Sequence, residues 1–433
     1  MSLRGLSSGR AGEVQFGRFL SNKKVKVIEL IDNICKSTIE ASKDRHVLLI
    51  EDTTEANFQD HVNRVKGLGT VGNGKDVGFF VHPLLAVDAQ EGVCLGLADL
   101  HIWQRTEPQS KDYKKLPIEE KESFRWIETA ERGKSRLSQT PLLTVVADRE
   151  ADIYELWDRL PDERTHVLVR ASQDRLLVHS EEDKEEKERK LFGYMDCLAV
   201  EGSYILDLPA TKKRSKHDAV MVVRFGQVRI KRPQSRMDKS SSSDILVSII
   251  DVREDDSSVV GNEVPIHWRL VTTHEVKSMA QARQCIEWYC QRWHIEQTFR
   301  TVKSQGLDIE SSLIESGEKL EKLAVLAFSA AVKVMQLVMA RDGSTRPATD
   351  VFDEDDIEVL QHVGKSLEGK TEKQKNHYEV GSLAWSAWII ARLGGWKGYK
   401  SERKPGPITM LNGLKDFANI QRGWMMAKMV LRA

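Results

Sequence analysis

The sequence predicts an α/β protein, and three observations support this fold class. HVLLIEDTT (46–54) and LLTVVADRE (142–150) are apolar runs that end in acids, a pattern typical of strands buried on both faces of a sheet. Two more strands are expected between them, at 79–87 and 93–103. A charged helix is expected around 117–132, which gives the order strand, strand, strand, helix, strand of an α+β or α/β core.

Composition narrows the possible classes of protein. The chain has 433 residues, enough for about two to four domains, and its 65 Lys and Arg equal its 65 Asp and Glu, so net charge alone predicts no nucleic-acid partner. No uninterrupted apolar run reaches the ~18 residues of a membrane span, so we expect no membrane partner and a cytoplasmic location. The 5 cysteines form no C-x-x-C pair, which argues against a disulfide framework or a zinc site.

A β-rich insertion is expected at 200–275, because apolar and polar residues alternate there between lysine-, serine- and aspartate-rich turns. Five strands are expected in it: YILDL, AVMVVRF, QVRIKR, DILVSII and HWRLVTT. Residues 212–239 hold ten Lys or Arg against two Asp. This basic window is either a solvated face or a surface for phosphates, and the sequence leaves both open.

A long helix is expected from a cap at Ser278 to about Gly306. At ~100° per residue, Tyr289, Arg292, Glu296 and Lys303 share an arc about 60° wide, beside an apolar arc that can pack on a core. Further helices are expected at 22–42 and 320–340 and in the tail, where the segment 383–393 suits either an internal core or a pairing surface.

Three carboxylates suit a metal site. Asp52 and Asp148 each end an apolar strand, at the edge where open sheets gather functional groups, and Glu296 is the single acid among the cations of the long helix. Together they could hold two Mg²⁺ ions about 3.5–4 Å apart. Taken singly, each has a plainer interpretation: turn residues after Asp52, a helix start at Asp148, and i,i+4 pairs of Glu296 with Arg292 and Arg300.

The spacing Tyr289-x2-Arg292-x3-Glu296-x6-Lys303, after Asp52-Thr-Thr and Asp148-Arg-Glu-Ala-Asp, resembles the bacterial DDE transposases of the insertion-sequence-four family, especially its transposon-five-like branch. The resemblance extends from about residue 14 to the C-terminus. It implies a ribonuclease-H-like catalytic core that is interrupted by a β-rich insertion and followed by a helical C-terminal unit.

The resemblance also implies roles for individual residues. Asp52, Asp148 and Glu296 match the catalytic, metal-binding triad, which uses two Mg²⁺ or Mn²⁺ ions. The residues that match DNA contacts of the family are Arg170, Trp268, Tyr289, Arg292 and Lys303. Trp268 corresponds to an aromatic that stacks on a flipped base, although an ordinary buried strand residue would also fit its position.

The implied activity is cut-and-paste transposition of double-stranded DNA. The transposon ends are cleaved through a hairpin and joined to target DNA by a homodimer. The expected parts are an N-terminal helical remnant (1–45), the core in two pieces (46–199 and 276–342), the insertion (200–275) and the helical C-terminal unit (343–433).

Two other functions remain open. VQFGRFLSNKKVKVIELI resembles only the closing part of the family's end-binding region, so the chain could be a truncated, non-catalytic inhibitor of transposition that acts through heterodimers. A stand-alone structure-specific nuclease could use the same core.

Overall fold

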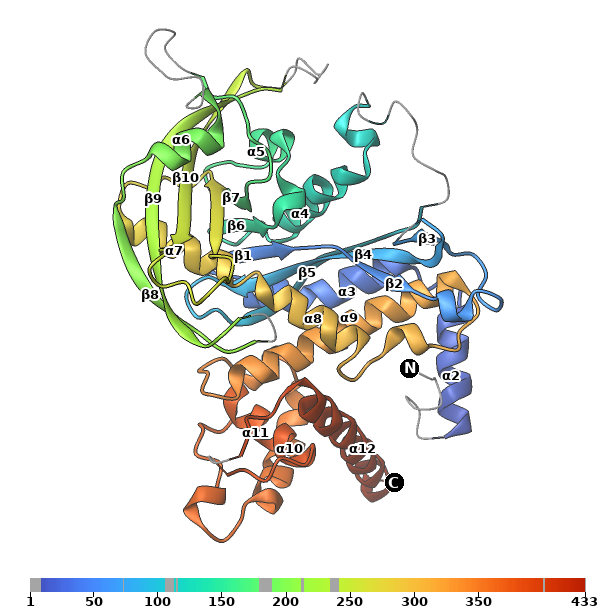
Figure 1. Ribbon diagram of the computed structural model, residues 1–433. Helices are drawn as coiled ribbons and strands as arrows, with labels where there is room; N and C mark the ends of the chain where they lie inside the picture. Colours follow the sequence, from blue (N-terminus) through green and yellow to red (C-terminus); the bar gives the residue numbers. More distant parts are fainter. Residues whose placement is uncertain are drawn as a thin grey trace. The chain divides into compact units, whose positions relative to one another are not determined.

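The computed structural model describes residues 9–72, 74–105, 113, 116–178, 189–211, 214–233, 241–399 and 402–432 (Figure 1). The chain divides into two compact units. The first unit comprises Met1–Lys43, Thr53–Thr106 and Trp293–Ala433, and the second comprises Asp44–Asp52 and Glu107–Arg292.

Parallel strands form the centre of the second unit. β1 (His46–Glu51) pairs with β6 (Leu142–Ala147), which pairs with β7 (Thr165–Arg170), and all three run parallel. After their first residue, β1 and β6 are buried throughout, as their apolar runs predict. The helices α4 (Arg125–Arg136) and α5 (Tyr154–Arg159) lie beside these strands (Figure 1).

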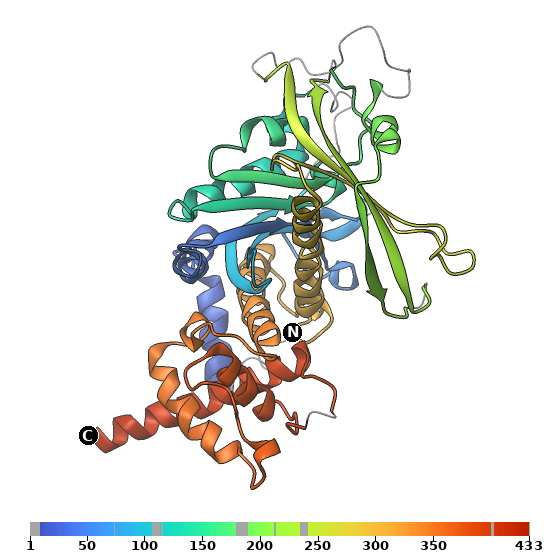
Figure 2. The same ribbon diagram turned by 90° about the vertical axis from the view of Figure 1, so that its left-hand side faces the viewer.

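The predicted insertion continues the same sheet. β11 (His267–Thr272) pairs with β7, and β10 (Asp244–Glu254), β9 (His217–Lys231) and β8 (Gly202–Leu208) follow in that order, each antiparallel to its neighbour. Figure 2 shows their long, twisted course. The helix α6 (Leu191–Cys197) contacts β9 and β10.

One detail of the insertion differs from the prediction. AVMVVRF and QVRIKR were expected as separate strands, but both belong to β9. The ladder to β10 continues without interruption through Gly226, which pairs with Ile249. The glycine therefore takes part in a regular strand and makes no turn.

Several cations of the basic window have structural partners. The buried Glu254 carboxylate accepts hydrogen bonds from Arg214 Nη1 at 3.0 Å and His217 Nε2 at 2.7 Å, and Arg229 pairs with Asp244 at 2.6 Å. Arg232 donates to the Ser241 carbonyl at 2.6 Å. These described cations favour the plainer interpretation of the window, whereas 212–213 and 234–239, like most of the charged tract at 180–190, lie outside the described residues.

Sheet strands and core helices also build the first unit. β4 (Asp76–Asp88) pairs with β2 (Thr54–Asn57), β3 (Gly69–Val71) and β5 (Cys94–Trp103), all antiparallel. The helices α3 (Val27–Ala41) and α9 (Gly317–Ala340) pack on β5. The orange-to-red part of Figure 1 holds α10 (Glu354–Leu367), α11 (Leu383–Leu393) and α12 (Pro407–Arg432).

Short 3-10 turns occur in both units. In the second unit they are η3 (Ile118–Glu120), η4 (Glu122–Phe124) and η5 (Arg149–Ala151). In the first unit they are η1 (Gln59–His61), η7 (Ile309–Ser311), η8 (Ala348–Asp350) and η9 (Glu372–Gln374).

The helix α9 forms much of the core of the first unit. It is the one described helix whose length and hydropathy suit a membrane span, and 67% of that window is buried inside the protein, as in a core helix. Its Lys322, only 1% exposed, donates to the carbonyls of Leu20 and Asn22, each at 3.2 Å. A buried ammonium thereby satisfies the last carbonyls of α2 (Arg10–Ser21).

The long helix expected from Ser278 to about Gly306 is broken into α7 (Met279–Cys290) and α8 (Trp293–Lys303). The cap at its start is confirmed, because Ser278 Oγ accepts from the Gln281 amide at 3.3 Å. Around Gln291 and Arg292 the ladder tightens to bonds with Trp288 and Tyr289, three residues back. The single arc that was predicted from Tyr289 to Lys303 is therefore wrong, and helical angles hold only within α7 and within α8.

Partly buried imidazoles beside the start of β1 predict acid sensitivity. His274 Nε2 is 2.7 Å from Thr144 Oγ1, which is 2.8 Å from His46 Nε2, and the rings of His274 and His166 stack at 3.9 Å. Burial, followed by the nearby His166 and His46, lowers the pKa of His274 to about 3. Its folded-state pKa thus lies below the unfolded value of about 6.5, and the imidazole stays neutral in the folded protein.

We expect the free energy of unfolding to decrease by up to about 1.4 kcal/mol per pH unit for this proton as the pH falls from about 6.5 toward 3. His274→Asn should reduce that slope in denaturant titrations at a series of pH values. His362→Asn, at an exposed position of α10, is the control and should keep it. Equal slopes for the two variants would contradict the prediction.

Candidate active site

Asp52 and Asp148 follow neighbouring parallel strands of the second unit. The register pairs His46 with Leu142 and Ile50 with Val146. If the register continued for two residues, Asp52 would lie opposite Asp148 on the same face, at the strand spacing of about 4.8 Å. The two predicted carboxylates thus follow the carboxyl ends of two neighbouring strands.

Asp148 also shapes the chain that follows it. Its side chain accepts a hydrogen bond from the Glu150 amide at 2.8 Å and caps η5. The predicted acidic helix start is therefore present as a 3-10 turn. Capping uses Oδ1, so this role does not prevent the carboxylate from binding a cation as well.

Glu51 and Arg125 adjoin the two aspartates, and sequence reasoning gave them no role. Glu51 is fully buried at the end of β1; burial raises its pKa well above the ordinary value, Arg125 opposes the rise, and Asp52 adds to it. Arg125 Nη2 lies 2.8 Å from Glu150 Oε2. Arg125 thus faces the acids that follow both strands, a relation that only long-range packing creates.

Asp152 holds the segment after β7 against the segment after Asp148. Its Oδ2 accepts from the amides of Ser172 at 2.6 Å and Gln173 at 2.7 Å, and its Oδ1 pairs with Arg175 Nη2 at 2.5 Å. The Asp152 side chain is fully buried, and Arg175 stacks over Trp157 at 4.9 Å. The second aspartate of Asp148-Arg-Glu-Ala-Asp152 was the available signal for this positioning role.

Arg292 and Tyr289 lie at the same edge of the second unit. Arg292 Nη1 is 3.0 Å from Asp52 Oδ2. The phenol of Tyr289 is buried; burial raises its pKa, while Arg292 and Arg170 lower it and Asp148 raises it further. The charges of Arg292, Arg170 and Asp148 therefore all act on the Tyr289 phenol. Two predicted DNA contacts, Arg170 and Arg292, thus lie near a third, Tyr289.

Arg170 and Trp268 complete this group. Arg170, the last residue of β7, donates to the His267 carbonyl at 2.9 Å. Trp268 in β11 has its ring centroid 6.0 Å from that of Tyr289. Its side chain is only half-buried, so the interpretation of Trp268 as an ordinary buried strand residue does not hold.

Glu296 and Lys303 belong to the first unit. Both are in α8, seven residues apart, and therefore share one helix face. Ile295 and Val302 are buried on another face. Lys303 pairs with Glu310 at 3.2 Å, and Arg300 lies over the Trp293 ring at 5.1 Å. The convergence of Glu296 with Asp52 and Asp148 stays a prediction.

The chemistry of the second unit's carboxylates suits a divalent cation. Adjacent, partly accessible aspartates offer the oxygen ligands that Mg²⁺ and Mn²⁺ take, and the Asp52 side chain is 20% exposed. Among the described residues, no three His, Cys, Asp or Glu side chains are arranged to hold a metal ion together. The strands that precede Asp52 and Asp148 are neighbours in the sheet, and the metal site of the predicted triad stays a prediction.

A comparison with known families adds an independent finding. Residues 119–333 match the family model described as the transposase DDE domain. The match indicates a DDE transposase. A transposase DDE domain implies activity on DNA and DNA as the partner. The matched segment includes Asp148 and Glu296 and every predicted DNA contact, whereas Asp52 precedes it.

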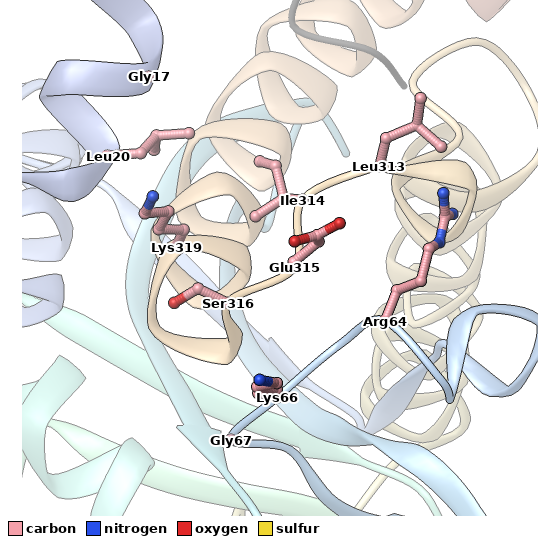
Figure 3. Close-up of a pocket in the computed structure, with 10 residues that line it drawn as sticks. All are labelled: Gly17, Leu20, Arg64, Lys66, Gly67, Leu313, Ile314, Glu315, Ser316 and Lys319. Carbon is pink, nitrogen blue, oxygen red and sulfur yellow. The ribbon is translucent and has the colours of Figure 1, made fainter.

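The first unit has two basic hollows. One, of about 680 Å³, is lined by Arg64, Lys66 and Lys319, and Figure 3 shows Glu315 between Lys319 and Arg64. The 66–67 loop and the start of α9 form its floor, where the Lys66 amide donates to the Glu315 carbonyl at 2.8 Å. The other, of about 960 Å³, is lined by four cations: Arg300, Arg341, Arg403 and Lys404.

The buried pair of Asp152 and Arg175 predicts a large loss of stability on charge removal. Asp152→Asn should lower the free energy of unfolding by about 3–5 kcal/mol, because it leaves a buried guanidinium without its counter-charge. Asp196→Asn is the matched control: Asp196 pairs with Arg269 at 2.6 Å but its side chain is 58% exposed, so about 1 kcal/mol or less is expected. Similar losses in urea titrations would contradict this assignment.

Proposed function

We propose that the chain is a metal-dependent cut-and-paste DNA transposase of the insertion-sequence-four family, transposon-five-like branch, with a ribonuclease-H-like core. The observation that supports this most is the parallel pairing of β1 and β6, the strands that Asp52 and Asp148 follow, in a chain with a transposase DDE domain match. The parallel strands β1, β6 and β7 in one unit and the antiparallel pair β4 and β5 in the other agree with such a core.

Asp52, Asp148 and Glu296 would hold two Mg²⁺ or Mn²⁺ ions. When bound, these ions would help to activate the attacking hydroxyl and stabilise the leaving oxygen. The triad side chains would fix the position of these ions at the edge of the sheet. Asp152 and Arg125 would keep the segments after β6 and β7 in place, so that the carboxylates need little rearrangement before reaction.

The cations and rings beside Asp52 would bind the DNA strand. Arg170 and Arg292 are positioned around the Tyr289 phenol, where they can bind a phosphate, and the half-exposed Trp268 can stack on an extruded base. Lys303 and the basic hollows of the first unit would also bind DNA phosphates.

The proposed reaction sequence uses one site for four steps. Water attacks a phosphodiester at the transposon end and releases a 3′-hydroxyl. That hydroxyl attacks the opposite strand and forms a hairpin, water reopens the hairpin, and the 3′-hydroxyl then attacks a target phosphodiester. We propose that this occurs in the cytoplasm, on paired ends in a homodimer. Neither the described residues nor the family match favours the inhibitor alternative.

Cleavage of a terminal-repeat duplex tests the proposal. With Mg²⁺ or Mn²⁺, Asp148→Asn should reduce cleavage at least about a hundredfold, since the several kcal/mol that bound metal supplies would be lost. Asp256→Asn, whose side chain is 80% exposed, should cleave like the wild type. Gel analysis should also resolve a hairpin product. Equal cleavage by the wild type and Asp148→Asn would rule out the proposed active site.

A further inference from the structure

Asp52 and Arg292 combine two functions in one contact. If the proposed function holds, on which this inference rests, Asp52 binds metal and Arg292 binds a DNA phosphate. The two side chains nevertheless contact each other, with Nη1 of Arg292 at 3.0 Å from Oδ2 of Asp52. The same carboxylate is therefore approached by a guanidinium and needed by a divalent ion.

The surroundings make this contact stronger than a surface ion pair. The side chains of Arg292 and Asp52 are 16% and 20% exposed, so water and salt screen them only partly. Two further arginines at this edge make other contacts: Arg125 pairs with Glu150 at 2.8 Å, and Arg170 donates to the His267 carbonyl at 2.9 Å. Arg292 pairs with Asp52, a predicted metal ligand.

A guanidinium and a divalent ion at one carboxylate repel each other. This repulsion is screened less at a partly buried site than in bulk water. Binding of the ion therefore weakens the hold of Asp52 on Arg292. A bound DNA phosphate is negatively charged, as Asp52 is, and it can then replace Asp52 as the partner of the guanidinium.

We propose that Arg292 is an exchangeable counter-ion of Asp52: a divalent cation at the Asp52 carboxylate releases the guanidinium to a DNA phosphate. Because coupling between two ligands is reciprocal, phosphate binding by Arg292 also raises the affinity of Asp52 for the ion. Arg292 would thereby link metal loading to the presence of DNA.

Metal binding by the DNA-free chain tests the first half of this proposal. We expect Arg292→Gln to bind Mn²⁺ at least about fivefold more tightly than the wild type, because the competing charge is gone. Arg292→Lys keeps a cation and should stay near the wild type. Arg253→Gln is the matched control: Arg253 pairs with Asp256 at 3.2 Å in an exposed contact, and its loss should change nothing.

Free Mn²⁺ measured by electron paramagnetic resonance gives these affinities without any turnover, and thermal melting checks that each variant is folded. Unchanged or weaker Mn²⁺ binding by Arg292→Gln overturns the proposal, as does a failure of every variant to bind the ion. If Arg292→Gln does not fold, Arg292→Lys still tests the charge: because the ammonium keeps the competing positive charge, an Mn²⁺ affinity that differs from the wild type by more than about threefold overturns the proposal.

DNA binding tests the second half. We expect Ca²⁺ to raise the affinity of the wild type for a fluorescent terminal-repeat duplex, and Arg292→Gln to lose at least about fivefold of that gain. An equal gain in both proteins overturns the coupling. These tests distinguish the counter-ion proposal from the proposed function. If Asp148→Asn loses cleavage but Arg292→Gln binds Mn²⁺ like the wild type, only the counter-ion proposal is refuted.

Discussion

The parallel pairing of β1 with β6 is the constraint on which the site depends. Two apolar strands, buried after their first residue, are held in one register from His46 and Leu142 to Ile50 and Val146. Because side chains alternate along a strand, a shift of this register by one residue would turn Asp52 and Asp148 to opposite faces. Core packing of hydrophobic residues therefore fixes the relative position of two carboxylates.

Acidic side chains that lie close together repel one another, and arginines offset this repulsion. Glu51, Asp52, Asp148 and Glu150 gather after the two strands, with Arg125 and Arg292 facing them. The two arginines differ in how firmly the surrounding structure holds them. Arg125 also donates to the Glu122 carbonyl at 3.0 Å and is held within the second unit, whereas Arg292 follows the break after α7, where the backbone ladder is already interrupted. This difference agrees with a structural role for one arginine and a functional role for the other.

Buried polar groups also organise segments far from the aspartates. Lys322 in α9 holds the end of α2, Asp152 holds the chain after β7, and Glu254 gathers Arg214 and His217 within the insertion. Each is a buried charge with several partners, the condition under which such a group is tolerated in a protein interior. Conformational specificity in this chain thus depends on a small set of polar contacts added to its apolar cores.

The sequence by itself determined the strands, most of the helices and the identity of the candidate acids. Apolar runs such as HVLLIE and LLTVVA, and the Ser278 cap, depend on neighbours in the chain, so local pattern was sufficient for them. Only the tertiary structure decided that the helix breaks at Gln291 and Arg292, whose intrinsic helix propensities are good, and that Arg292 reaches Asp52 across 240 residues of sequence. The contacts of Glu51, Arg125 and Asp152 were likewise decided only by the tertiary structure. Contacts of that range depend on which strands pair and where their ends meet, and no periodicity in a single segment contains that information.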